Sequence, residues 1–149
     1  MAKSVRVPPR WVVRTAWAIH RGIYRVTGGR RGLWPPRPGR WGALRLTTTG
    51  RRSGQPRSVI LAYFEEGPDL VLMSMNGWGE GEPAWQLNLA ANPEATVEFR
   101  RGSRQVRART ATGEEHTRLW ARWATIDKDL DGYAQKRTTP TVVIVLEPR

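Results

Sequence analysis

Six short segments rich in strand-forming residues constrain the fold more than any other feature of this sequence. Turns containing glycine, proline or asparagine separate them, and the segments span residues 43–49, 58–64, 70–74, 95–100, 104–111 and 142–146. Several of the connecting turns are short, which favours a small antiparallel barrel over a parallel sheet. The chain has 149 residues, which is long enough for one such domain with a proper core.

Three helical segments interrupt the strands. The first begins at Pro83 and ends near residues 92–93, because proline presets the first turn of a helix and Asn-Pro ends one. The second opens at Gly113, and a short third helix surrounds Tyr133. The sequence therefore predicts a mainly β (α+β) domain over residues 43–149, with about six antiparallel strands and peripheral helices.

Residues 1–42 form a separate basic segment, with an amphipathic helix at residues 10–27 followed by a linker rich in glycine, proline and arginine. At about 100° per residue, one side of this helix carries four arginines and the opposite side four apolar residues. These are Arg10, Arg14, Arg21 and Arg25, against Val12, Ile19, Ile23 and Val26. Such a helix either lies in a lipid headgroup layer or packs on the domain with its basic face in solvent. The linker tryptophans, Trp34 and Trp41, are expected to cap the edge of the core.

The formal charge of +12 is concentrated near the N-terminus, because residues 1–57 hold fourteen Lys/Arg and no acid. The chain has no cysteine, which excludes disulfides and thiol nucleophiles and fits a reducing cytoplasm. His20 and His116 lie too far apart in sequence for a zinc motif, so no metal site is expected. No apolar run is long enough to span a membrane, and arginines interrupt the N-terminus, so we expect neither a membrane span nor a secretion signal.

Residues 47–57 place three arginines, several hydroxyl groups and two glycines on a turn between the first two strands. Guanidinium groups form paired hydrogen bonds with phosphate or carboxylate, and glycines let backbone amides approach an anion. This pattern predicts a site for an acidic ligand, and a solvated basic hairpin is the alternative. The turn matches neither a Walker loop nor a dinucleotide fingerprint.

A glycine-rich loop at residues 73–85 leaves the third strand and arrives at a helix that carries Trp85 and Asn88 on one face. Three glycines allow close approach of the backbone to a flat ligand, so this loop is a candidate floor for an aromatic ring. The alternative is a flexible loop beside a core tryptophan. The paired acids, Glu80 with Glu82 among them, lie in turns or at a helix start, where acids usually serve solvation.

Together these blocks resemble the deazaflavin-dependent nitroreductase family, which contains split β-barrel reductases that use coenzyme F420. The resemblance is carried by residues 46–57, residues 83–93, Tyr133 and the closing residues 142–148. It implies a split β-barrel fold and the transfer of a hydride from reduced F420. The implied acceptor is hydrophobic or aromatic, such as a quinone, an enone or a nitro compound.

The resemblance also implies roles for individual residues. The acidic end of F420, a phosphate with a glutamate tail, is held by Arg51, Arg52, Ser53, Gly54 and Arg57. The backbone around Ser74, Met75 and Asn76 borders the deazaflavin ring, and the pocket is lined by Ala84, Trp85 and Asn88. Tyr133 closes the substrate side. The proton that completes reduction comes from water, from Tyr133 or from Ser74.

Some features depart from the family or favour other functions. Residues 75–78 read Met-Asn-Gly-Trp where family members often have Ser-Lys-Gly-Gly, so a positive charge is missing there. A sequence pI near 11.5 with interleaved tryptophans is also typical of nucleic-acid-binding modules, although no binding motif is present. The same barrel is also compatible with FMN, heme or a fatty ligand. Residues 10–27 are the candidate for peripheral contact with the inner face of the plasma membrane.

Overall fold

The computed structural model describes residues 7–26, 32–100 and 102–149, except the side chains of residues 20, 22–26 and 78. Within these ranges there are six strands: β1 (Gly42–Thr49), β2 (Pro56–Glu66), β3 (Asp69–Met73), β4 (Glu94–Phe99), β5 (Gly102–Thr110) and β6 (Val143–Pro148). The helices of the described part are α1 (Arg10–Val26), α2 (Ala84–Ala91), α3 (Gly113–Ile126) and α4 (Leu130–Gln135), with a 3-10 turn η1 (Asn76–Trp78). The parts of the expected N-terminal segment at residues 1–6 and 27–31 lie outside the described residues.

The six strands close into a barrel in the order β1-β2-β3-β6-β5-β4. Every neighbouring pair is antiparallel, including the closing pair β1 and β4. The predicted barrel is therefore confirmed, and each predicted strand and helix overlaps its counterpart in the structure. The division at residues 42 and 43 stays a prediction, although β1 begins at Gly42.

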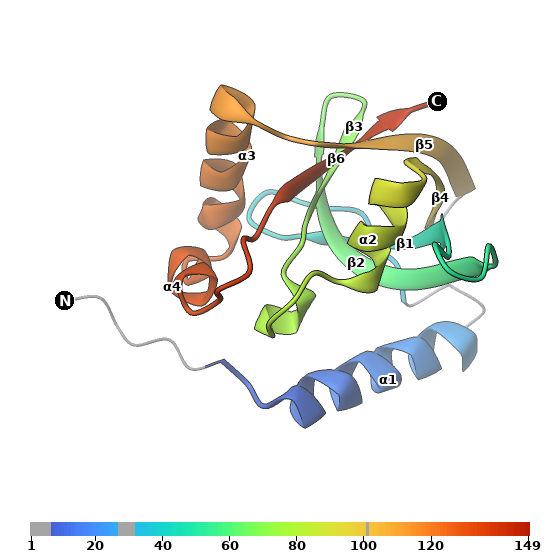
Figure 1. Ribbon diagram of the computed structural model, residues 1–149, viewed down its shortest axis with the longest axis horizontal. Coiled ribbons are helices and arrows are strands. Elements are labelled where there is room, and N and C mark those ends of the chain that lie inside the picture. The colour runs from blue at the N-terminus through green and yellow to red at the C-terminus, as the bar shows by residue number, and fades with distance from the viewer. Residues whose placement is uncertain (1–6, 27–31, 101) are drawn as a thin grey trace.

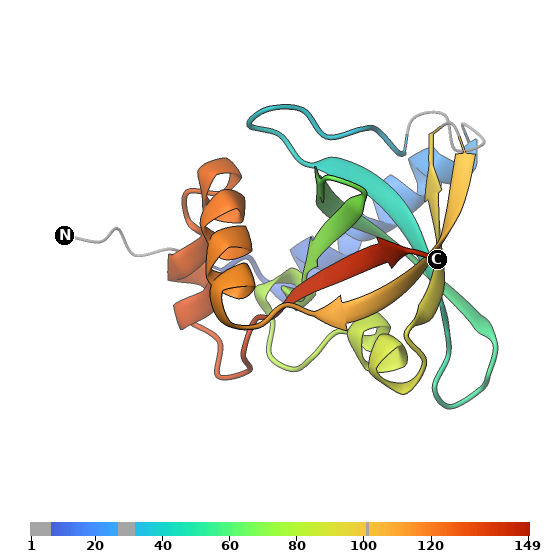
Figure 2. The same cartoon turned by 90° about the horizontal axis from the view of Figure 1, so that it is seen from above.

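Two apolar clusters hold the fold together. One fills the barrel, with fully buried side chains such as Leu44, Leu46 and Val97. The other lies between the outside of the barrel and the pair α3 and α4, which pack together on one side (Figure 2). Trp123 is at its centre, with its ring 5.8 Å from that of Trp41. Alternate residues of β3 serve the two clusters because successive strand side chains point to opposite faces.

The two linker tryptophans differ in their environment. Trp41 is half-buried and packs on the second cluster, between the barrel and α3/α4, which will be called the outer cluster. This confirms its predicted position at the core edge. Trp34 is 45% exposed, so the same prediction for Trp34 is wrong. The linker folds back on β1 through a bridge between Trp34 and Ala43, and the Trp34 indole donates to the Trp41 carbonyl at 3.1 Å. These local bonds hold Trp34 on the surface.

The N-terminal helix α1 lies along the outside of the barrel, below η1 in the view of Figure 1. Its bounds confirm the predicted helix to within one residue. No helix in the described part of the chain has the length and apolar character needed to cross a bilayer.

Candidate functional site

The turn between β1 and β2 together with the first two residues of β2, residues 50–57, will be called the arginine turn. The Gly50 amide donates to the Gln55 carbonyl and the Gly54 amide donates to the Gly50 carbonyl, both at 2.8 Å. Gly54 has a φ of +70°, which disfavours any residue with a side chain, and a Cβ on Gly50 would lie 2.8 Å from the Ser53 Oγ. Both glycines are therefore needed for the shape of this turn.

The cations of the arginine turn are exposed and available. Arg51, Arg52 and Arg57 all lie on the surface, and none forms an ion pair with an acid among the described residues. Arg57 donates to the Ser53 Oγ at 3.4 Å, a long bond within the turn. Positive charge without neighbouring acids attracts an anionic ligand, so this turn suits a phosphate or carboxylate.

Asn88 fixes the arginine turn to α2. Its side-chain oxygen accepts from the Arg51 backbone amide at 3.2 Å and from the Arg51 Nη1 at 3.1 Å. Its Nδ2 donates to the Thr48 Oγ1 at 3.1 Å, and Asn88 is only 3% exposed. The predicted cofactor contact of Asn88 stays a prediction, but its hydrogen bonds already give it another role, which is to orient Arg51.

The second predicted element, residues 74–82, will be called the glycine loop. Asn76 and Gly77 both have positive φ, at 50° and 61°, and Asn is among the residues that adopt this conformation. The Asn76 Nδ2 donates to the Glu80 and Gly81 carbonyls at 3.0 and 3.1 Å. The Asn76 side chain therefore shapes the loop from within.

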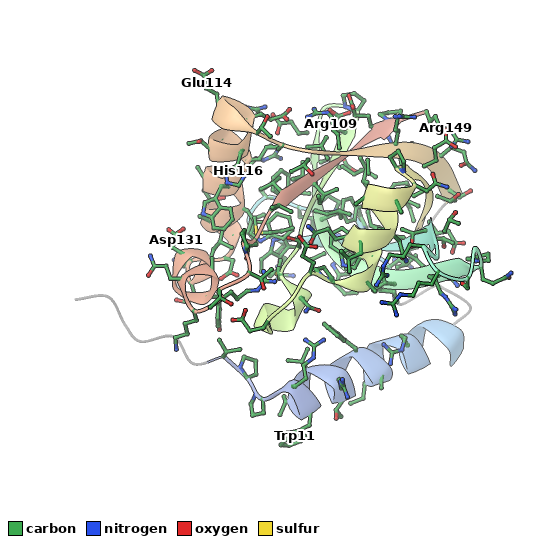
Figure 3. The ribbon with its side chains drawn as sticks, in the orientation of Figure 1. Trp11, Arg109, Glu114, His116, Asp131 and Arg149 are labelled. Carbon is green, nitrogen blue, oxygen red and sulfur yellow. The ribbon has the colours of Figure 1, made fainter. Side chains whose placement is uncertain are left out.

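The first two turns of helix α1 pack against the glycine loop through Arg10, Val13 and Trp17. The Arg10 Nη1 donates to the Asn76 carbonyl at 2.6 Å, and a Cβ on Gly77 would lie 2.7 Å from the Val13 Cγ1. The helix thus packs on the domain, as one of the two expected arrangements had it, and Arg10 stays exposed while its guanidinium also contacts this loop. Contact of this helix with lipid stays a prediction. The residues on the other side of α1, such as Trp11 at 70% exposed, point away from the barrel (Figure 3).

The segment after α4, residues 137–141, will be called the clasp segment, and the sequence reasoning missed it. Arg137 is 7% exposed and donates to the carbonyls of Ser74, Gly79 and Gly81 at 2.8, 3.0 and 2.7 Å. It also donates to the Thr141 Oγ1 at 2.6 Å. A single arginine after a short helix forms no motif, so only the folded chain reveals these contacts.

Glu80 ties the same two segments together from the surface. Its carboxylate accepts from the backbone amides and hydroxyls of Thr138 and Thr139 at 2.7 to 3.3 Å. Hydrogen bonds from Thr138, then from Thr139, lower the pKa of Glu80 to about 2. The carboxylate is therefore ionised at neutral pH, and the interaction is lost only as the pH falls toward about 2.

The predicted ring-border residues use their side chains for packing. Ser74 is fully buried, and its Oγ accepts from the Val142 amide at 2.9 Å. Met75 is half-buried and packs on the outer cluster beside α3. Ala84 is exposed at the start of α2, whereas Trp85 is 8% exposed and belongs to the barrel core. Because these side chains are packed within the protein, a ligand beside the loop would contact mainly its backbone.

The structure brings the arginine turn and the glycine loop to α2, whereas Tyr133 lies on α4. The arginine turn is bonded to the middle of α2 through Asn88, and the glycine loop runs directly into its first turn. Tyr133, half-buried on α4, lies just before the clasp segment that grips the loop. Cations at one end and a backbone-lined loop at the other fit a ligand with an acidic tail and a flat ring.

A family model described as F420H(2)-dependent quinone reductase matches residues 17–148 of this chain. An F420H(2)-dependent quinone reductase of Mycobacterium tuberculosis (strain H37Rv) is 30% identical over an alignment of 149 positions, which covers 94% of this chain and 97% of the relative. The match therefore extends over the barrel, the arginine turn, the glycine loop and most of α1.

Two solved structures share the fold. An F420-H2 dependent reductase, FDR-A, has a TM-score of 0.61 and 28% identity, and the match covers 70% of this chain and 93% of that one. A protein described as a domain-swapped dimer has a TM-score of 0.65 and 26% identity, and the match covers 90% of this chain and 99% of that one. The second match extends beyond the barrel because it spans a larger share of this chain.

Proposed function

The chain belongs to the F420H(2)-dependent quinone reductase family, and we propose that it holds F420 between the arginine turn and the glycine loop. It is an F420-dependent oxidoreductase with a split-barrel fold, and its acceptor is a quinone. Reduction of enones and nitro compounds, also expected from the sequence, stays a prediction. The observation that carries the proposed site is that exposed guanidinium groups without acidic partners among the described residues and a glycine-containing loop both adjoin α2.

The acidic tail of the cofactor is assigned to the arginine turn. Arg51 is already oriented by Asn88, so less conformational freedom is lost when it binds an anion. Arg52 and Arg57 add charge on the same turn, and Ser53 adds a hydroxyl donor. Because Gly54 carries no Cβ and the space beside it is open, an anion can approach the turn closely at this position.

When bound, F420 supplies a two-electron hydride donor. The chain itself must orient the ring and acceptor and keep water out. The glycine loop is suited to this role because its conformation is fixed from α1 by Arg10 and from the clasp segment by Arg137. Val13 of α1 also lies over Gly77, so an apolar side chain covers part of the loop.

Tyr133 is a better candidate than Ser74 for the residue that donates the proton completing quinone reduction. Ser74 is fully buried, and its Oγ already contacts the Val142 amide, so it is poorly placed to meet a substrate. Tyr133 is half-buried on α4 next to the clasp segment and carries a hydroxyl that can donate. Water remains the competing donor, as the sequence reasoning expected.

We expect Tyr133→Phe to lower kcat for quinone reduction by about tenfold or more, because positioned proton donors contribute about 10²-fold or more. The dissociation constant for F420 should change less than about twofold, since the tail site lies elsewhere. Stopped-flow oxidation of F420H2 by a soluble quinone measures the first quantity, and tryptophan fluorescence measures the second. An unchanged kcat would assign the proton to water.

The cofactor assignment itself has a direct test. Oxidised F420 titrated into the full chain should quench tryptophan fluorescence with a micromolar dissociation constant, and reduced F420 should be consumed when a quinone is added. FMN and heme, tested in the same assay, should not compete. Absence of F420 binding at low ionic strength would contradict the proposed site.

The exposed side of α1 is assigned to the membrane surface, where many quinones reside. Trp11, Val12 and Ile19 are 70%, 38% and 60% exposed, and Val12 and Ile19 lie on the side of the helix opposite Arg10. An apolar helix face that the barrel does not cover can enter the headgroup layer, and the chain's charge of +12 favours anionic lipid. These features support the proposal that the protein binds peripherally to the cytoplasmic face of the plasma membrane, and the absence of cysteine fits that compartment.

We expect the chain to co-sediment with vesicles that contain phosphatidylglycerol, and the variant Trp11→Ser/Ile19→Ser to lose at least about 90% of this binding. Trp34→Ser, which removes an exposed tryptophan from the linker instead, should bind as the unmodified chain does. Light scattering in the absence of lipid measures the oligomeric state and so tests the alternative that this face binds a second copy of the chain. A dimer that dissociates in Trp11→Ser/Ile19→Ser, without vesicle binding, would assign this face to a second copy.

A further inference from the structure

Arg137 is a buried cation that the proposed function has not yet used. It is 7% exposed, and burial lowers its pKa from the ordinary arginine range. Arginine stays ionised in proteins in any case, so the structure contains a charge that is largely removed from water. A buried charge is stable only when its donors are satisfied, and Arg137 meets this condition with three carbonyls and one hydroxyl.

The three carbonyls all belong to the glycine loop. Ser74 lies at its start, and Gly79 and Gly81 lie near its end, so one guanidinium joins both ends of the loop. The Thr139 Oγ1 strengthens the connection by accepting from the Gly81 amide at 2.9 Å. A loop that contains three glycines has many accessible conformations when unrestrained, and these bonds select one in which Asn76, Gly77 and Gly81 have positive φ.

Arg137 also belongs to the same local structure as Tyr133. Its backbone amide donates to the Ala134 carbonyl at 3.2 Å, so it continues directly from the last turn of α4. The guanidinium therefore connects the helix that carries Tyr133 to the loop that borders the ring. Any change in this connection alters the spacing between these two sides of the site.

We propose that Arg137 is a positioning residue that sets the spacing between the ring-binding loop and the acceptor wall on α4. This inference rests on the proposed function, because it assigns the ring to the glycine loop. Arg137 touches neither the tail site nor, in its buried position, the bulk solvent. It should therefore affect the transfer step much more than the affinity for F420, because transfer rates depend steeply on the separation of the reacting atoms.

The test compares Arg137→Lys with Lys136→Met, a neighbouring exposed cation. A lysine keeps the charge but cannot reach the two ends of the loop with a fixed fork of donors. We expect kcat for F420H2 oxidation to fall by about 100-fold, while the dissociation constant for F420 changes less than about threefold. The visible absorption band of bound oxidised F420 should shift toward that of the free cofactor. Lys136→Met should match the unmodified chain in all three measurements.

A second variant keeps the test decisive if Arg137→Lys does not fold. Thr141→Val removes one acceptor of Arg137 with little change in volume, and it should give the same pattern with a kcat decrease of about threefold to tenfold. The inference is overturned if a folded variant keeps both its kcat and its absorption band, or if kcat and affinity fall equally. Failure of the unmodified chain to bind F420 would instead contradict the proposed function.

Discussion

Replacing Arg51 and Arg52 together with alanine should weaken F420 binding by about 100-fold. Each exposed guanidinium that contacts a phosphate or carboxylate contributes roughly one charge-assisted hydrogen bond, and the loss of about 1.4 kcal/mol per contact is a factor of ten. Both side chains are on the surface and lack acidic partners in the described chain, so their removal leaves no buried charge behind. The fold should remain intact, because neither side chain belongs to the core.

Fluorescence titration at several salt concentrations gives the measurement. Affinity of the unmodified chain should fall as salt rises, and this dependence should be weaker in the double variant because fewer ionic contacts remain. The matched control is Arg37→Ala/Arg40→Ala, which removes the same charge from the linker, at the end of the barrel away from the arginine turn (Figure 2). Equal losses in the two double variants would mean that overall charge, rather than the arginine turn, attracts the cofactor.

The sequence predicted the barrel because its signals are local. Strand composition and turn residues recur at short spacing from residue 43 onward, and each predicted strand forms in the structure. Antiparallel neighbours joined by short turns also follow from this pattern, as β1 with β2 and β4 with β5 show. The arginine turn was found in the same way, since its residues are consecutive.

The contacts that fix the site could not be predicted in this way, because they join residues distant in sequence. Arg10 reaches Asn76 and Arg137 reaches Ser74, which are separated by 66 and 63 positions. The periodicity of α1 separates an arginine side from an apolar side, but it cannot say which side packs on the barrel. An arginine stripe suggests solvent or lipid by composition, whereas in the structure the Asn76 carbonyl gives Arg10 a partner within the fold.

Asn88 illustrates a different kind of gap between pattern and structure. Its place on one helical face with Trp85 was predicted, and both residues are buried as that pattern requires. The direction of its amide was not predictable, because it depends on where the arginine turn meets α2. The structure shows this amide bonded to Thr48 and Arg51, so the residue connects the barrel to the tail site.

Asn88→Ala should consequently lower both stability and cofactor affinity. The change removes three hydrogen bonds and leaves the nearly buried Thr48 hydroxyl without its Asn88 donor, so the free energy of unfolding should fall by about 2–3 kcal/mol. The affinity for F420 should fall about tenfold, because Arg51 loses the contact that holds its guanidinium in place. Urea denaturation measures the first effect, and fluorescence titration of F420 measures the second.

The energetic coupling between Asn88 and Arg51 in F420 binding distinguishes this explanation from a general loss of structure. If Asn88 acts through Arg51, then Asn88→Ala should reduce the affinity much less in an Arg51→Ala background than in the unmodified chain. Asn88→Asp, which keeps the acceptor for Arg51, should retain more affinity than Asn88→Ala, and Gln86→Ala on the same helix should change neither property by much. Additive losses in the double variant would show that Asn88 supports the fold without orienting Arg51, because two residues that act independently do not share their contribution to binding.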